Sequence, residues 1–149
     1  MPGTEPAPLL LYLLKRLELA VRARLDEIVR PAGLTALQYT ALTVLERHAD
    51  MSSAQLARQS FVTAQSMADM ITTLQGRGLI ERHRDRADRR RLVVSLTAEG
   101  RVLLDRYRDA VAALEGEMIA GLRTALNACY DNLSIPAALA GREVAVGGE

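Results

Sequence analysis

The segment that decides the fold runs from Asp85 to Gly100 and reads DRADRRRLVVSLTAEG. It joins an arginine-rich turn, a short apolar stretch and a helix start. Six arginines crowd into or beside the turn against Asp85 and Asp88, although the whole chain has a formal net charge of only +1. They are Arg82, Arg84, Arg86, Arg89, Arg90 and Arg91. Such a basic protrusion suits a phosphate backbone or a narrow groove of negative potential.

The composition is that of one globular domain with a real core, since the chain has 149 residues and is 49% hydrophobic. Aromatic residues make up only 3%, so the core must be aliphatic. The single cysteine, Cys129, rules out an internal disulfide and a cysteine-based metal cluster, and fits a reducing cytoplasm. The apolar run from Leu9 to Leu14 ends too soon for a membrane span and lacks the pattern of a signal peptide. We expect a cytoplasmic protein without a membrane partner.

The first half of the chain predicts four helices. Apolar residues recur at helical spacing from Leu10 to Ile28, which indicates a long amphipathic helix that stops at Pro31 and Gly33. Three similar helix starts follow, each with a hydroxyl residue as its cap. Two of them fit a capping box, with glutamine three residues after the cap. These starts are Thr35 with Gln38, Ser52 with Gln55, and Thr63 with Ser66.

The second half predicts a hairpin and a long helical tail. The third short helix ends at residues 76–78, strands over residues 79–84 and 92–96 flank the arginine-rich turn, and Thr97 caps a long helix. We expect Gly121 to interrupt that helix, and a last helix to run from Leu122 to Leu133. Three helices followed by a hairpin is the element order of a winged helix-turn-helix. A small helical bundle with an unrelated hairpin explains the helices equally well, but not the basic tip.

The helix over residues 63–77 has two different faces. Met67, Met70, Ile71 and Leu74 form an apolar stripe for the core. The opposite face is small, polar and nearly uncharged, whereas a solvated helix usually carries Glu and Lys pairs. Short hydrogen-bonding side chains suit a helix in a major groove, although an acid there meets phosphate repulsion unless it accepts from cytosine or pairs with an arginine. The candidates are Thr63, Gln65, Ser66, Asp69, Thr72 and Thr73.

The turn supplies the candidates for phosphate or minor-groove contact. Arginines on a hairpin are usually solvated or paired, but two aspartates leave more than half of this cluster without a partner. We expect Asp88 and Arg90 to form an ion pair that stiffens the turn, worth only ~0–1 kcal/mol, and Arg86, Arg89 and Arg91 to project freely. The DNA-contacting candidates are Arg84, Arg86, Arg89 and Arg91.

Two motifs beside the turn carry a family resemblance. The first reads Leu74-x-x-x-Gly78-Leu79-Ile80-x-Arg82, and the second reads Asp88-x-Arg90-x-x-x-Val94-x-Leu96-Thr97-x-x-Gly100. Together they resemble the wing signature of MarR-type transcriptional regulators. The resemblance covers about residues 34–100 at motif level, and most of the chain in element order. Two residues depart from the family pattern: Arg91 stands where a small residue is more frequent, and Asp69 lies on a face that is commonly neutral or basic.

The resemblance implies a mainly α protein with a small β hairpin, a winged helix-turn-helix with long N- and C-terminal dimerisation helices. In the implied homodimer, each recognition helix lies in a major groove and a wing arginine enters the adjacent minor groove. We divide the chain accordingly into a flexible N-terminus (1–8), a dimerisation helix (9–33), a DNA-binding domain (34–100), C-terminal dimerisation helices (101–135) and a flexible tail (136–149).

The apolar stripes over residues 10–28 and 103–118 are wider than a core of three short helices needs, so a partner chain is a natural cover. The alternative is that they pack on each other within one chain. In a dimer, two recognition helices about 34 Å apart would read a pseudo-palindrome.

Many MarR-like regulators bind small phenolic or anionic molecules where the dimer helices meet the DNA-binding lobe. Here Tyr12, Arg16 and Tyr39 are the candidates, although Tyr at helical spacing more often belongs to a core. We predict a ligand-responsive repressor that binds double-stranded DNA as a homodimer, without cofactor, metal or catalysis. A winged helix used only for protein contact is the alternative. A small enzyme is disfavoured, because we find no nucleophile–base set, phosphate-binding glycine loop or metal set.

Overall fold

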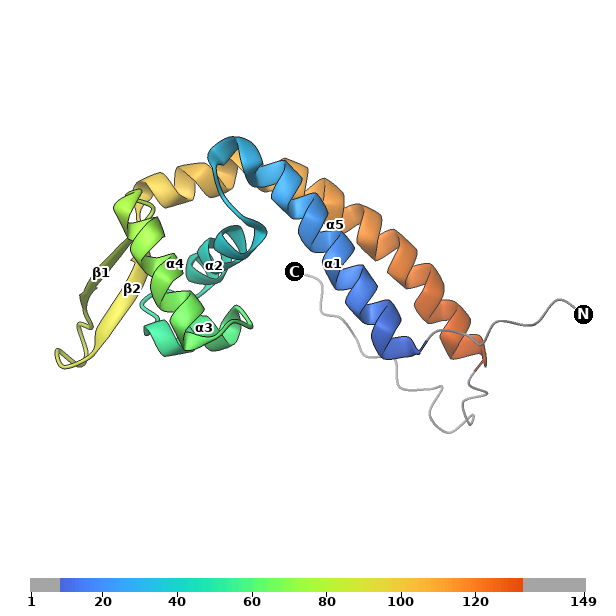
Figure 1. Ribbon diagram of the computed structural model, residues 1–149, viewed down its shortest axis with the longest axis horizontal. Coiled ribbons are helices and arrows are strands. Elements are labelled where there is room, and N and C mark those ends of the chain that lie inside the picture. The colour runs from blue at the N-terminus through green and yellow to red at the C-terminus, as the bar shows by residue number, and fades with distance from the viewer. Residues whose placement is uncertain (1–8, 133–149) are drawn as a thin grey trace, which may run out of the picture. The chain divides into compact units, whose positions relative to one another are not determined.

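The computed structural model describes residues 9–132, with only the backbone for residues 126, 127 and 129–132. The chain forms helix α1 (Leu10–Val29), a 3-10 helix η1 (Arg30–Ala32), helices α2 (Ala36–Arg47), α3 (Ser53–Gln59) and α4 (Ala64–Gly76), strands β1 (Ile80–Arg84) and β2 (Leu92–Leu96), and helix α5 (Ala98–Asn132). It divides into two compact units within α5, between Val111 and Ala112. Figure 1 shows α2, α3 and α4 gathered together with the hairpin at their side. The mainly α winged-helix prediction is confirmed.

The parts of the chain that we expected to be flexible, residues 1–8 and 136–149, lie outside the described residues, as does Leu133. Cys129 lies in the backbone-only stretch of α5.

The short helices start as their sequences predict. Thr35 Oγ1 accepts from the backbone N of Gln38 at 3.2 Å, and Gln38 Oε1 accepts from the backbone N of Thr35 at 3.0 Å. Ser52 and Gln55 repeat this reciprocal pair at 3.2 and 2.9 Å. Each box satisfies two backbone amides that have no partner inside the helix. The caps that start α2 and α3 are therefore formed by residues only three positions apart.

One apolar core joins the three short helices to the hairpin and to the start of α5. The stripe predicted for α4 is buried in it, and aliphatic side chains predominate. Its largest fully buried members are Leu42, Leu45, Leu56, Met67, Ile71, Leu74, Ile80, Leu104, Val29 and Val93. Because every element from the end of α1 to the start of α5 contributes, the core fixes the position of α4 relative to the hairpin.

The hairpin is held to the helices at its base. β1 and β2 pair antiparallel, from Ile80 opposite Leu96 to Arg84 opposite Leu92. An isolated bridge also joins Val94 to Met51, just before α3, with N···O distances of 3.2 and 2.8 Å. The turn over residues 85–91 extends beyond this anchored base.

The start of α5 packs tightly against the entry to β1. Thr97 Oγ1 accepts from the backbone N of Gly100 at 3.1 Å and donates to the carbonyl of Gly78 at 2.6 Å. A Cβ atom on Gly100 would lie 2.3 Å from the carbonyl oxygen of Leu79 and 2.6 Å from Cδ1 of Leu96. The Thr-x-x-Gly spacing therefore combines a helix cap with a close approach that only glycine allows.

We expect Gly100→Ala to lower the free energy of unfolding by about 1–3 kcal/mol, because the added methyl group must push backbone atoms apart. Equilibrium urea unfolding measures this change. Gly76→Ala is the matched control, since a Cβ there meets nothing within 4 Å. It should change stability by no more than about 0.5 kcal/mol, in the stabilising direction. Equal stability of the two variants would contradict the close approach at Gly100.

Arg108 ties α5 to the end of α2. Its Nη2 donates to Glu46 Oε1 and to Asp105 Oδ1, each at 2.7 Å. The hydrogen bond to Glu46, followed by the one to Asp105, raises the pKa of the guanidinium above its usual range. Arg108 therefore joins the first turns of α5 to the end of α2.

The expected break in the C-terminal helix is wrong, because α5 continues without interruption from Ala98 to Asn132. A glycine inside a helix lowers its stability by about 1 kcal/mol relative to alanine, but its backbone adopts helical angles freely. Helix-forming neighbours on both sides outweigh that loss at Gly121. A single glycine was therefore too weak a signal to end the helix.

The N-terminal half of α1 carries apolar side chains that the chain leaves exposed. Leu10, Leu14 and Leu17 lie on the predicted stripe and are 67%, 53% and 47% exposed. Only the C-terminal end of the stripe packs against the core, through Leu25 and Ile28. An apolar face of this extent needs another surface to cover it.

Candidate nucleic-acid interface

The N-terminal end of α4 is built around two hydroxyl groups. Thr63 Oγ1 accepts from the backbone N of Ser66 at 3.1 Å and donates to Ser66 Oγ at 2.9 Å. Both residues are exposed. The cap thus stabilises the helix while it places two small polar groups at its exposed end.

The outer face of α4 is exposed along its whole length, as the sequence pattern predicts. Gln65 Nε2 donates to Asp69 Oδ1 at 3.1 Å, one helical turn away. This contact gives the acid a partner on its own helix. An amide–carboxylate pair presents both donors and acceptors outward, as a base-reading surface requires.

Two threonines continue this face with their hydroxyl protons turned inward. Thr72 Oγ1 donates to the carbonyl of Ala68 at 3.0 Å, and Thr73 Oγ1 donates to the carbonyl of Asp69 at 3.1 Å. Such bonds to the preceding turn are common for threonine in a helix. They leave acceptor oxygens and methyl groups to face outward, which suits contacts with base amino groups and thymine methyls.

The two aspartates shape the turn of the hairpin through backbone amides. Asp85 Oδ1 accepts from the backbone N of Ala87 at 2.9 Å, and Asp88 Oδ1 accepts from the backbone N of Arg90 at 3.0 Å. Asp88 therefore contacts Arg90 as expected, but its carboxylate accepts from the backbone N–H of Arg90 and does not pair with the guanidinium. Asp85 and Asp88 fix the turn because each carboxylate accepts from the backbone N–H two residues later, in place of a main-chain carbonyl.

Two of the four candidate arginines are held against the protein. Arg91 lies 3.7 Å from Asp85, between Nη1 and Oδ2, and its Nη2 donates to Gln55 Oε1. Arg84 Nη1 donates to the carbonyl of Arg90 at 3.2 Å. The expectation that Arg91 projects freely is wrong, because it joins the hairpin to the capping box of α3.

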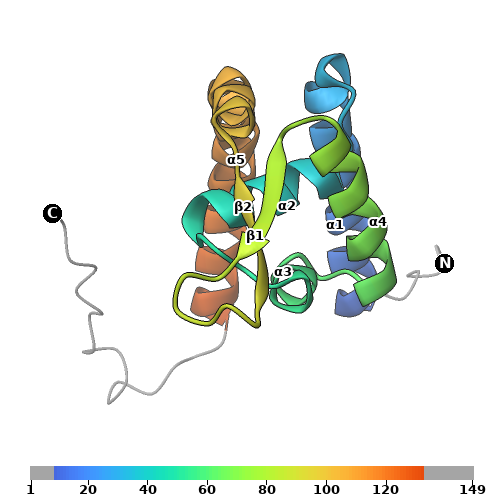
Figure 2. The same ribbon diagram turned by 90° about the vertical axis from the view of Figure 1, so that its left-hand side faces the viewer.

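The other two arginines, Arg86 and Arg89, stand at the tip of the turn. Both are exposed, and within the part of the chain that the structure describes neither makes a hydrogen bond or an ion pair. Figure 2 shows the turn at the same end of the first unit as α3 and the N-terminal end of α4. The turn that carries these unpaired guanidinium groups thus lies at the same end of the first unit as the start of α4.

Sequence reasoning missed the contacts of Arg77. Its Nη1 donates to the carbonyl of Gly33 at 2.9 Å and its Nη2 donates to the carbonyl of Ala32. This fork holds the C-terminal end of α4 against the end of η1. In the sequence, only the position of Arg77 just after α4 could have indicated such a role, because arginines near helix ends often bind free carbonyls.

The candidate effector residues are brought together only in part. The guanidinium of Arg16 lies 5.9 Å from the ring centre of Tyr12, within cation–π range, and both are exposed on α1. Tyr39 is 5% exposed and belongs to the core. Tyr39 is therefore a core residue, as tyrosines at helical spacing more often are.

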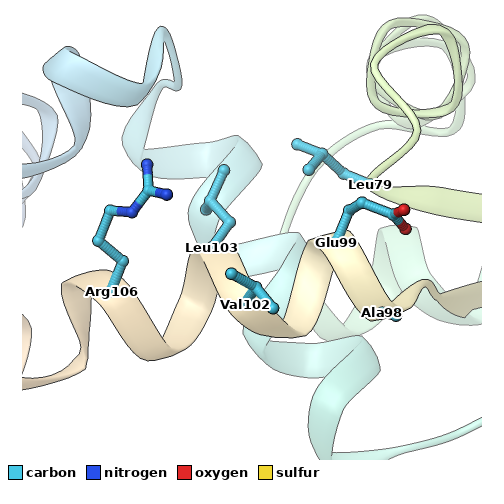
Figure 3. Close-up of a pocket in the computed structure, with 6 residues that line it drawn as sticks. All are labelled: Leu79, Ala98, Glu99, Val102, Leu103 and Arg106. Carbon is cyan, nitrogen blue, oxygen red and sulfur yellow. The ribbon is translucent and has the colours of Figure 1, made fainter.

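A pocket of about 370 Å³ opens elsewhere, beside the first turns of α5. In Figure 3 the side chains of Glu99, Leu103 and Arg106 point to the same side of α5, and Leu79 lies opposite Glu99. The lining is apolar, with one carboxylate and one guanidinium at its rim. Its residues are Leu79, Ala98, Glu99, Val102, Leu103 and Arg106, and none of them was a sequence candidate.

Two classes of site are absent from the described residues. No group of three or more His, Cys, Asp or Glu side chains lies within reach of one metal ion there. Within the same residues, no helix combines the length and apolarity needed to cross a membrane.

Known proteins resemble this chain in sequence and in fold. A family model described as the MarR family matches residues 32–91. The HTH-type transcriptional repressor Rv2887 of Mycobacterium tuberculosis is 33% identical over 111 residues, which cover 74% of this chain and 80% of the relative. The repressor CouR of Rhodococcus jostii RHA1, solved on a 23-mer DNA duplex, superposes with a TM-score of 0.69 and 30% identity over 85% of this chain and 93% of CouR. Rv2887 in complex with salicylic acid gives a TM-score of 0.65 and 28% identity over 87% and 98%.

Proposed function

The chain belongs to the MarR family of transcriptional regulators, and on that premise we propose that it binds double-stranded DNA as a homodimer and acts as a ligand-responsive repressor of transcription. The observation that carries this proposal is the pair of unpaired arginines, Arg86 and Arg89, at the same end as the polar face of α4. CouR was solved on a DNA duplex, and Rv2887 is named a repressor. The protein would act by binding alone, in the cytoplasm, without catalysis.

In the proposed complex α4 lies in the major groove. A helix with its side chains is about 10–12 Å wide and the groove about 12 Å, so only short side chains fit between helix and bases. The outer face of α4 meets this condition. Gln65 and Asp69 would face base edges, Thr63 and Ser66 the phosphates near the helix start, and Thr72 and Thr73 bases or phosphates farther along.

The hairpin tip would enter the adjacent minor groove. Arg86 and Arg89 would lie against phosphates or the groove floor, where negative potential attracts guanidinium groups. Arg84 and Arg91 would face the backbone with their remaining donors while their contacts keep the turn in shape. This arrangement explains why Asp85 and Asp88 bind main-chain amides and leave the tip arginines unpaired.

A salt titration of duplex binding tests the proposal. Each phosphate neutralised by an arginine contributes about −0.9 to the slope of log K against log salt concentration. Two tip arginines on each of two subunits predict a slope of about −4 or steeper, measured by fluorescence anisotropy. A flat response, or no binding, would favour the alternative of a winged helix used only for protein contact.

We expect Gln65→Ala to relax base preference at one position of each half-site by about 1–3 kcal/mol, because the amide would contact a base edge. Selection of duplexes from a random-sequence pool, by the wild type and by the variant, measures the change. Gln59→Ala is the control, since Gln59 is exposed at the end of α3 and outside the outer face of α4. Equal weakening of all sequences by Gln65→Ala would show that α4 does not read bases.

The exposed leucines of α1 support a homodimer. We assign residues 9–33 and 101–135 to dimerisation through their apolar stripes, and residues 34–100 to DNA binding. A twofold dimer presents two copies of α4, so its operator would be a pseudo-palindrome.

A small aromatic anion is the effector that fits best. Salicylic acid is bound to Rv2887, and p-coumaroyl-CoA is bound to CouR. The exposed pair of Tyr12 and Arg16 offers a ring and a cation to such a molecule, and the pocket beside Arg106 offers apolar walls and a cation.

A further inference from the structure

Phe61, in the turn between α3 and α4, combines two unusual features. It is the only phenylalanine of the chain, and its side chain is 94% exposed. Its backbone has a φ of 56°, in the left-handed region that bulky side chains avoid. A large apolar ring in water therefore coincides with an unfavourable backbone conformation.

The same backbone turn occurs at two other helix ends, and there the residue is glycine. Gly33 after η1 has a φ of 67°, and Gly78 after α4 has a φ of 72°. In each turn the next residue donates its N–H to a carbonyl five residues earlier, at 3.1 to 3.4 Å. These bonds run from Val62 to Ala57, from Leu34 to Val29, and from Leu79 to Leu74. The fold thus calls for glycine at position 61, and the phenyl ring contributes nothing to closing the turn.

The turn lies next to the groups proposed to bind DNA. The cap of α4, Thr63, follows it by two residues, and Figure 2 shows the segment that joins α3 to α4 at the same end as the hairpin turn. Arg58, one turn before it on α3, is exposed and makes no ion pair within the described residues. An exposed apolar ring that follows an unpaired cation and precedes a base-reading helix along the chain suits the edge of a major groove, where phosphate, deoxyribose and thymine methyl groups lie close together.

We propose that Phe61 is a specificity residue whose ring packs on a thymine methyl group and its deoxyribose at the edge of the major groove. This inference rests on the proposed function. It explains the exposed ring and the unfavourable φ together, because the side chain is retained for a contact that forms only on the duplex. A second protein chain is the other possible occupant of this ring, and the experiment below separates the two.

The test compares wild type with Phe61→Gly on one duplex, selected by the wild type from a random-sequence pool. The duplex is made once with thymine and once with uracil, which lacks the methyl group. We expect wild type to bind the thymine duplex about 5-fold or more tightly than the uracil duplex. Phe61→Gly should bind the thymine duplex about 10-fold more weakly and lose most of the preference for thymine.

The melting temperature shows that this loss is not caused by misfolding. Phe61→Gly should melt a few degrees higher than wild type, because glycine relieves the unfavourable φ. Unchanged affinity and thymine preference in Phe61→Gly would overturn the inference and point to a protein partner. A lower melting temperature would also overturn it, because the ring would then belong to the fold. If wild type selects no duplex, the proposed function fails.

Discussion

The double substitution Leu14→Glu and Leu17→Glu should convert the protein into a monomer and weaken duplex binding by about 100-fold or more. Both leucines are about half exposed on α1, so the variant loses little within its own subunit. In a dimer interface, however, four buried carboxylates would meet in an apolar setting without partners. A monomer binds only one half-site. It loses the high effective concentration with which a bound dimer presents its second subunit to the second half-site.

Sedimentation velocity and fluorescence anisotropy measure these two effects. Ala23→Glu is the matched control, since it places the same charge on an exposed position on the opposite side of α1 from Leu14. That control should remain dimeric and bind DNA like the wild type. A double variant that stays dimeric would show that this face of α1 is not the interface.

The second large effect concerns the hairpin tip. Arg86→Ala with Arg89→Ala should weaken duplex binding by about 30- to 100-fold and reduce the salt slope by about 3–4 in the dimer. The fold should be unaffected, because neither side chain has a partner among the described residues. Thermal unfolding checks this point, and a titration from 50 to 200 mM salt measures the slope.

A charge-matched control separates local contact from general attraction. Arg47→Ala with Arg101→Ala removes the same charge from two exposed positions away from the tip. We expect this variant to keep the wild-type slope and to lose less than about 3-fold in affinity, since salt screens distant charges. Equal losses in the two double variants would show that net charge, and not the tip, governs binding.

Features determined by neighbouring residues could be predicted from the sequence. The capping boxes at Thr35 and Ser52 need only residues three positions apart, and the glycine at position 78 marks the end of α4 through its own φ. The hairpin followed from alternation and from its basic turn. The two faces of α4 followed from helical periodicity.

Features that join distant parts of the chain could not be predicted. Arg91 meets Gln55 from another element, and Arg77 reaches Gly33 and Ala32 across the fold. Only the packed core brings these residues together. The pocket beside Arg106 likewise depends on where β1 begins relative to α5.

The break expected at Gly121 failed for a different reason. The low helix propensity of one glycine is outweighed by the cooperative continuity of a long helix. The prediction that Arg91 projects freely was wrong because spacing alone cannot show which side chains of a crowded turn find partners. Arg86 and Arg89, the two DNA-contact candidates that find no partner in the described chain, carry the proposal.

Hydroxyl-radical footprinting of the full chain on its selected duplex tests the central claim most directly. A homodimer with one α4 and one hairpin tip per half-site predicts two protected segments, related by symmetry and centred about 10 base pairs apart, each with minor-groove protection beside it. A single protected segment at saturating protein, or none, would contradict the account.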